Sequence, residues 1–142
     1  MRLTFREKSL CLLLLSLVAA FGIYLASVLP SQSTHIAPNH VIAFSGMLIL
    51  LVVLQIVGNS ILAIASRREL SAAVQSDERD GLISLKATRL ASYVLATGVF
   101  FSLCVAVLIP GNFAFVHVLL AFWVLAQATE ILSQLVFYRR GA

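Results

Sequence analysis

The chain has 142 residues, of which 61% are hydrophobic and only 11% are charged. Soluble domains carry charges on about 25% of their residues, so this composition excludes an ordinary soluble domain. The apolar residues form four runs, at 9–29, 41–65, 90–109 and 113–137. Each run reaches the roughly 20 residues that cross the ~30 Å hydrocarbon core of a bilayer. We predict an all-α integral membrane four-helix bundle that forms a single transmembrane domain over residues 1–142.

The ten Lys and Arg residues indicate how the four runs cross the membrane. They precede the first run, follow the fourth, or lie between the second and third, and none occurs in 30–40 or 110–112. The positive-inside rule therefore predicts a multi-pass membrane protein with both termini in the cytoplasm. This topology accounts for the net charge of +4 without direct nucleic-acid binding. The first run could instead be a signal peptide, but its apolar stretch exceeds the roughly 7–15 residues of such segments.

A charged segment, residues 67–89, forms the only sizeable connection on the predicted cytoplasmic side. Ser76 or Asp77 can cap a helix, and the helix dipole favours acids such as Glu78 and Asp80 in its first turn. We predict that the third helix begins near Asp77 and projects into the cytoplasm before it enters the membrane. The projecting segment, residues 67–89, is either a solvated charged cap or a surface that docks a partner.

Polar residues on the last run make up the most informative pattern in the chain. Trp123, Gln127, Glu130 and Gln134 recur at spacings of four, three and four, which places them on one stripe of a helix. A carboxylate within a membrane span is costly and marks a candidate functional site. The stripe is therefore expected to face the inside of the bundle.

Counting residues from the nearest basic residue gives the depth of each polar side chain. Glu130, Asn59, Thr97 and Ser16 all fall about 12–13 Å from the cytoplasmic side, and Gln55 and Gln127 about 18 Å. We predict an intramembrane polar layer, with Tyr93 and Asn59 as hydrogen-bond partners of Glu130. Three roles remain open for it: holding the bundle together, binding a proton or other cation at Glu130, or forming a dimer interface. Arg89 is an alternative partner that would keep Glu130 ionised.

The remaining reactive residue types carry weaker signals. His35, His40 and His117 lie on the predicted outer side, but no regular spacing or nearby acid supports a zinc site. Cys11 and Cys104 belong to opposite leaflets and cannot form a disulfide. The chain has none of the common enzyme motifs, so we predict no enzymatic activity, no cofactor and no metal.

Two segments carry a resemblance to a known group of proteins. They are Asp77-Glu78-Arg79-Asp80-Gly81-Leu82-Ile83 before the third run, and Tyr138-Arg139-Arg140-Gly141 at the end. The chain resembles small four-span bacterial inner-membrane proteins that have an Asp-Glu-Arg-Asp motif and a Tyr-Arg-Arg-Gly terminus. Gly81 departs from that pattern, which usually has Arg there. The group resembles proteins encoded beside small helix-turn-helix regulators.

The resemblance implies that a cytoplasmic regulatory protein is the partner, contacted by Asp77, Glu78, Arg79, Asp80 and Arg89. The leading hypothesis is a non-enzymatic membrane protein that docks this partner through residues 67–89. A homodimeric ion- or solute-coupled transporter that uses Glu130 is the alternative, as is a structural accessory subunit.

Overall fold

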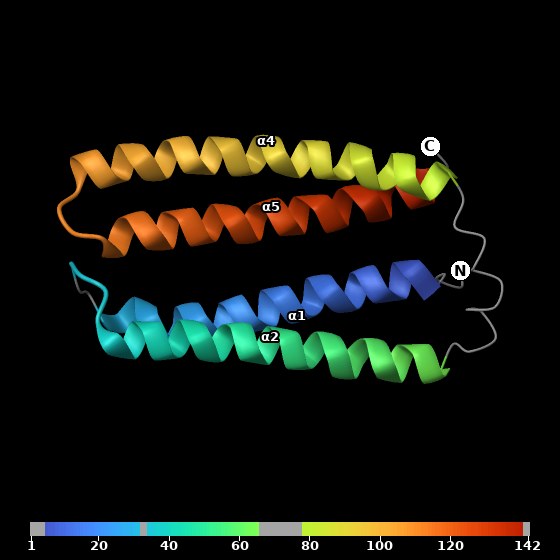
Figure 1. Cartoon of the computed structure of the whole chain (residues 1–142), viewed down its shortest axis with the longest axis horizontal. Helices are drawn as coiled ribbons and strands as arrows, with labels where there is room; N and C mark the ends of the chain where they lie inside the picture. The colour runs from blue at the N-terminus through green and yellow to red at the C-terminus, as the bar shows by residue number, and fades with distance from the viewer. Residues whose placement is uncertain (1–4, 32–33, 66–77, 141–142) are drawn as a thin grey trace.

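A computed structural model describes residues 5–31, 34–65 and 78–140 of the chain (Figure 1). It has four long helices: α1 (Phe5–Val28), α2 (Pro38–Ala65), α4 (Glu78–Leu108) and α5 (Phe113–Arg140). A 3-10 turn, η1 (Leu29–Ser31), follows α1, and the described residues contain no strand. The predicted all-α four-helix bundle is confirmed. Each long helix is apolar and long enough to cross a membrane, so by length and composition this is a multi-pass membrane protein.

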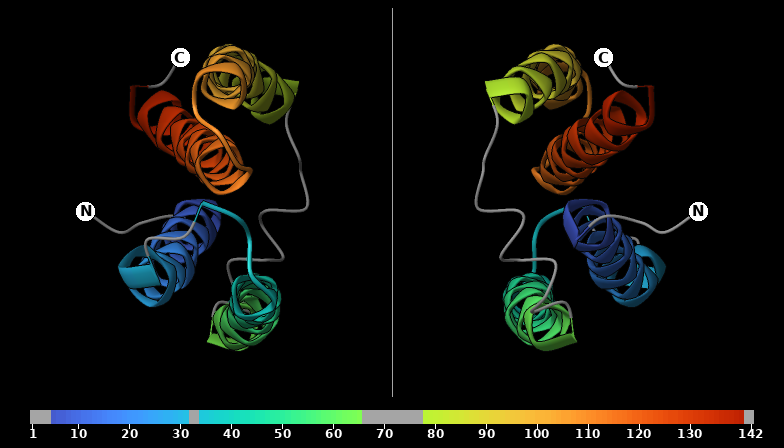
Figure 2. Two further views of the ribbon diagram at one scale, coloured as in Figure 1. Left: turned by 90° about the vertical axis from the view of Figure 1, so that its left-hand side faces the viewer. Right: turned by 90° about the vertical axis from the view of Figure 1, so that its right-hand side faces the viewer.

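The helices pack as two antiparallel pairs, α1 with α2 and α4 with α5. Contacts between α1 and α5 join the pairs, so the order across the molecule is α2, α1, α5, α4 (Figure 1). The flanking helices α2 and α4 do not pack against each other, and Figure 2 shows them apart when the bundle is viewed along its length. We call the end with both termini the basic end, and the opposite end the loop end (Figure 1).

The α1 helix supplies most of the core between the two pairs. Its buried Ala20, Tyr24 and Val28 form one apolar cluster with Met47 of α2 and Leu120 of α5. Nearer the basic end, buried Leu17 packs with Val124 and Ile131 of α5 in a second cluster. These contacts fix how the α4–α5 pair sits against α1.

Small residues bring α4 close to α5. Ala87, Ala91, Gly98 and Ser102 are buried on the side of α4 that faces α5. Small side chains allow two helices in a membrane to approach closely. The approach is tightest at Gly98, where an added Cβ would overlap Phe122 and lie 2.8 Å from its Cδ1 atom.

The register of α4 against α5 follows from two contacts, Thr88 with Glu130 and Gly98 with Phe122. In this antiparallel register the beginning of α4 lies level with the end of α5, so the two helices run side by side over their whole length. Arg89 lies level with Glu130, about two and a half turns from Arg139 along α5. The prediction that Arg89 and Arg139 mark the same depth is therefore wrong.

Candidate functional site

Glu130 lies on α5, where its Oε1 atom accepts a hydrogen bond of 2.8 Å from the hydroxyl of Thr88 on α4. The stripe that it shares with Trp123, Gln127 and Gln134 is half-buried. The opposite face of α5 is more exposed: Leu125 is 52% exposed, Leu132 49% and Val136 43%. The stripe thus avoids the most exposed face of its helix, as predicted.

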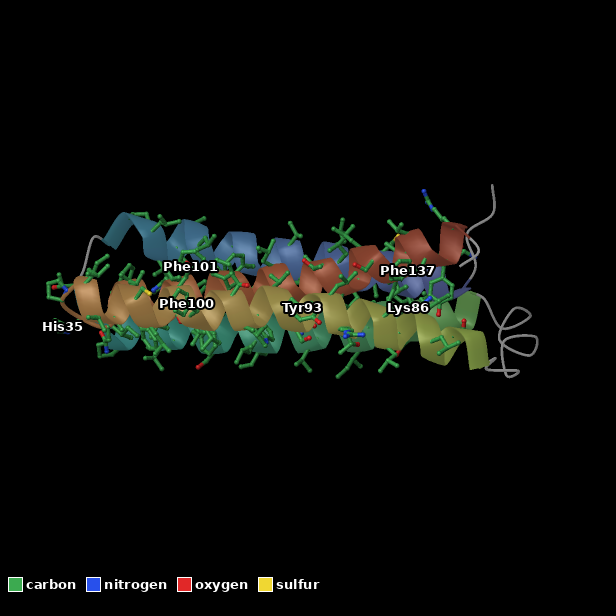
Figure 3. The ribbon with its side chains drawn as sticks, turned by 90° about the horizontal axis from the view of Figure 1, so that it is seen from above. His35, Lys86, Tyr93, Phe100, Phe101 and Phe137 are labelled. Carbon is green, nitrogen blue, oxygen red and sulfur yellow. The ribbon has the colours of Figure 1, made fainter. Side chains whose placement is uncertain are left out.

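The predicted partners of Glu130 need correction. The Tyr93 hydroxyl accepts a bond of 3.3 Å from Nε of Arg89, and the Thr97 hydroxyl donates to the Tyr93 carbonyl within α4. Both Tyr93 and Thr97 are exposed, and Figure 3 shows Tyr93 midway along the bundle. The error arose because Arg89 and Arg139 were taken to mark the same depth, which placed Thr97 level with Glu130. In the observed register Thr97 lies beside Phe122, about two turns further from the basic end.

A second polar group joins α1 to α2 and contains three of the predicted layer residues. Ser9 donates to Oδ1 of Asn59 (2.8 Å), Asn59 donates to Oε1 of Gln55 (3.2 Å), and Gln55 donates to the Ser16 hydroxyl. Ser16 closes the chain by donating to the Leu13 carbonyl (2.9 Å). Within the described residues, no hydrogen bond links this chain to Glu130. The predicted layer is thus divided between the two helix pairs.

The depth of both polar groups follows from counting inward from the loop end. Taking the ends of the helices, Leu108 and Phe113, as the start of a ~30 Å hydrocarbon core, the roughly 20 residues that cross it end near Thr88 on α4 and Ser133 on α5. The same count ends near Gly58 on α2. Glu130 therefore lies about one turn inside the boundary of the core at the basic end. A carboxylate at this depth is within reach of water and headgroups, which lowers the cost of its charge.

An ion pair that the sequence analysis did not identify lies at the basic end. Glu7, in the first turn of α1, has its Oε1 atom 4.0 Å from Nε of Arg139 in the last turn of α5. The Glu7 side chain is 12% exposed and that of Arg139 68%. The sequence contained a signal for Glu7: it is an acid between the basic residues Arg6 and Lys8, close to the start of the first apolar run. The positive end of a helix dipole favours an acid at the start of a helix.

The loop end contains a further polar contact between α1 and α5. The Tyr24 hydroxyl lies 2.9 Å from Nε2 of His117, and Nδ1 of His117 lies 2.8 Å from the Phe113 carbonyl oxygen. A carbonyl only accepts, so Nδ1 carries the proton. In the neutral ring Nε2 must then accept from Tyr24. The His117 ring also stacks on Phe113, with 4.0 Å between ring centroids.

The three histidines do not form one site. His40 is buried and its ring meets Phe113 edge-on at 5.3 Å, whereas His35 is exposed at the tip of the loop end (Figure 3). The described residues contain no group of three His, Cys, Asp or Glu side chains that could hold a metal ion. Both cysteines are free.

The predicted partner surface is only partly described. Asp77 lies outside the described residues, and the side chains of Glu78 and Arg79 are not described. Asp80 is half-buried, and Arg89 is exposed. No protein-family model, curated protein or solved structure matches this chain. The resemblance to small four-span proteins therefore stays a prediction, and the function must be inferred from the geometry.

Proposed function

We propose that this protein docks a cytoplasmic protein at the bacterial inner membrane, on a stalk built from the basic-end parts of α4 and α5. One observation supports the proposal: the α4–α5 pair is longer than a hydrocarbon core requires. The two helices contain 31 and 28 residues, about 46 and 42 Å, whereas the core needs only about 30 Å. The first two to three turns of α4 and the last two of α5 remain outside it.

The stalk is packed rather than frayed. Ile83 and Ala87 of α4 are buried, at 2% and 0% exposure. Two helices that are packed together outside the membrane form a rigid surface. A protein that only anchored itself in the bilayer would not need such a surface. Lys86 (Figure 3) and Arg139 are exposed and would provide charged contacts for a soluble partner. The resemblance described above implies a transcription regulator as the partner.

Site-specific photocrosslinking in native membranes tests this proposal. A photoreactive amino acid at Lys86 should give a discrete protein adduct, whereas the same group at Val107, which is 85% exposed at the loop end of α4, should not. Replacing residues 77–80 with alanine should remove the Lys86 adduct while the chain still inserts. Absence of a protein adduct at both Lys86 and Arg139 would reject the proposal.

A coupled transporter is the second candidate, because Glu130 is half-buried, close to the membrane boundary and bonded only to a hydroxyl among the described residues. In that case Glu130→Gln should abolish proton- or cation-dependent flux in reconstituted vesicles. Flux whose proton dependence survives the substitution would exclude Glu130 as the coupling group. In an accessory subunit, Glu130→Leu would instead disrupt assembly of the complex.

A further inference from the structure

One face of α4 is exposed along most of the helix and follows a heptad spacing. Its members are separated alternately by three and four residues, and each is exposed. We call this face the α4 seam: Leu82, Leu85, Arg89, Ser92, Ala96, Val99 and Leu103. The α5 helix packs on a different side of α4, against Ala87, Ala91 and Gly98, so the seam is left without a helix partner in the described structure.

We propose that a second copy of this chain covers the seam, as a parallel α4–α4 dimer in which Arg89 of one copy pairs with Glu130 of the other. A sustained alternation of three and four residues keeps one face of a helix against a parallel partner in a left-handed supercoil. Ser92 and Ala96 lie in the middle of the seam, and such small residues let two membrane helices approach closely.

Charge complementarity identifies the occupant as a second copy. The guanidinium of Arg89 is exposed near the edge of the core and contacts the Tyr93 hydroxyl, with no carboxylate against it among the described residues. Glu130 likewise has a hydroxyl and no cation against it in that part of the chain. Within residues 5–31, 34–65 and 78–140, Arg89 and Glu130 thus present charges of opposite sign at the same depth, neither with a counter-charge against it. Two copies inserted in the same direction keep these depths equal.

The coiled-coil geometry brings the two charges together. In the heptad defined by the seam, Leu82, Arg89 and Ala96 occupy a positions, and Thr88 occupies the g position before Arg89. In a parallel pair an a side chain packs beside the a and g residues of its partner. Arg89 would therefore enter the second copy beside its Thr88, whose hydroxyl donates to Glu130. By symmetry the contact forms twice, and each copy completes the site of the other.

The intermolecular Arg89–Glu130 pair lowers the free-energy cost of the two charges, which surrounding lipid does not compensate. Near the edge of the core each charge is partly solvated, and a counter-charge lowers the remaining cost of placing it there. Exposed leucines outside the core, Leu82 at 58% and Leu85 at 68%, would also be covered by the same contact. The dimer does not depend on the cytoplasmic partner, because Lys86 and Arg139 lie off the seam.

Disulfide crosslinking between copies tests the seam. In a background with Cys11→Ser and Cys104→Ser, Ala96→Cys should form an intermolecular disulfide in membranes. The matched control is Thr97→Cys, one residue along and equally exposed but off the seam. We expect about a tenfold higher yield at Ala96, the ratio that a difference of 1.4 kcal/mol produces. Equal yields at the two positions would overturn the proposal.

Charge exchange tests the pair. In the Ala96→Cys background, Arg89→Glu and Glu130→Arg should each lower the crosslinking yield about tenfold, and the double exchange should restore it. Arg89→Gln and Glu130→Gln provide milder variants if the reversed charges prevent insertion, and each should lower the yield while leaving helix content unchanged. Failure of the double exchange to recover the yield, or unchanged yields in both glutamine variants, would reject the Arg89–Glu130 contact.

Discussion

Among the glycines within the helices, Gly98 is the one where an added methyl group should most disturb the packing of α4 on α5. A Cβ built there overlaps Cβ and Cγ of Phe122, and that Cβ cannot move without shifting the α5 backbone. Phe122 is further held by stacking on Phe101, with 6.0 Å between ring centroids. The substitution Gly98→Ala must therefore push α4 and α5 apart along their closest contact.

The magnitude follows from two opposing effects. An alanine in an open helix position stabilises by about 0.5–1 kcal/mol relative to glycine, and overpacking a tight contact costs about 1–3 kcal/mol. Gly46→Ala is the matched control, because nothing lies within 4 Å of its added Cβ. Gly58→Ala should fall between them, since its nearest atom, 2.6 Å away, is the mobile Cδ2 end of Leu12. The gain from alanine is common to positions 98 and 46, so we expect Gly98→Ala to be about 1–3 kcal/mol less stable than Gly46→Ala.

Reversible unfolding in mixed detergent micelles, followed by circular dichroism, measures these differences. The expected order of stability is Gly46→Ala, then Gly58→Ala, then Gly98→Ala. The double variant Gly98→Ala with Phe122→Gly should recover part of the lost stability, because the Phe122 side-chain atoms that overlap the added Cβ are absent. Equal stabilities for the alanine variants at 98 and 46 would refute the close approach of α4 and α5.

Three further predictions follow from individual contacts. Asn59→Ala breaks two bonds of the α1–α2 chain and should cost about 1 kcal/mol in the same unfolding assay, whereas Ser60→Ala, which loses only a bond to its own helix, should be neutral. Tyr24→Phe leaves Nε2 of His117 without its donor and should lower the free energy of unfolding by about 1 kcal/mol. In a His117→Phe background the same Tyr24→Phe substitution should cause no further loss. Gly111→Ala forces an alanine to φ 94° and should lower stability by about 1–3 kcal/mol, which thermal unfolding in detergent would detect.

The sequence was sufficient for the helices because each run of apolar residues has one stable structure in lipid. Charges and turn residues bound those runs, so the end of α4 and the start of α5 at Pro110-Gly111 were predictable. The grouping of Ser16, Gln55 and Asn59 was also predictable, because each is polar and lies at a similar depth. The separation of these three residues from Glu130 could not be predicted, since depth does not show which helices are neighbours.

The register between α4 and α5 could not be derived from basic residues. Arg89 looked like a boundary marker because it is the last charge before an apolar run. The count from the loop end places the boundary beside Arg89, whereas Arg139 lies almost two turns beyond it on α5, so the two basic residues do not mark the same depth. The decisive signals were Gly98 and Thr88, whose small or hydroxyl side chains are common in membrane helices and therefore draw no attention in isolation.

The position of Glu130 changes what its charge requires. At mid-membrane an acid must be neutral or fully compensated, whereas one turn inside the boundary it can stay ionised if a cation or water meets it. Thr88 supplies one hydrogen bond and no charge. The nearest guanidinium in depth, that of Arg89, lies on a side of α4 that faces away from α5. A carboxylate and a guanidinium at one depth on different faces compensate each other only between molecules, and for this reason the dimer contact must be tested before any transport role for Glu130.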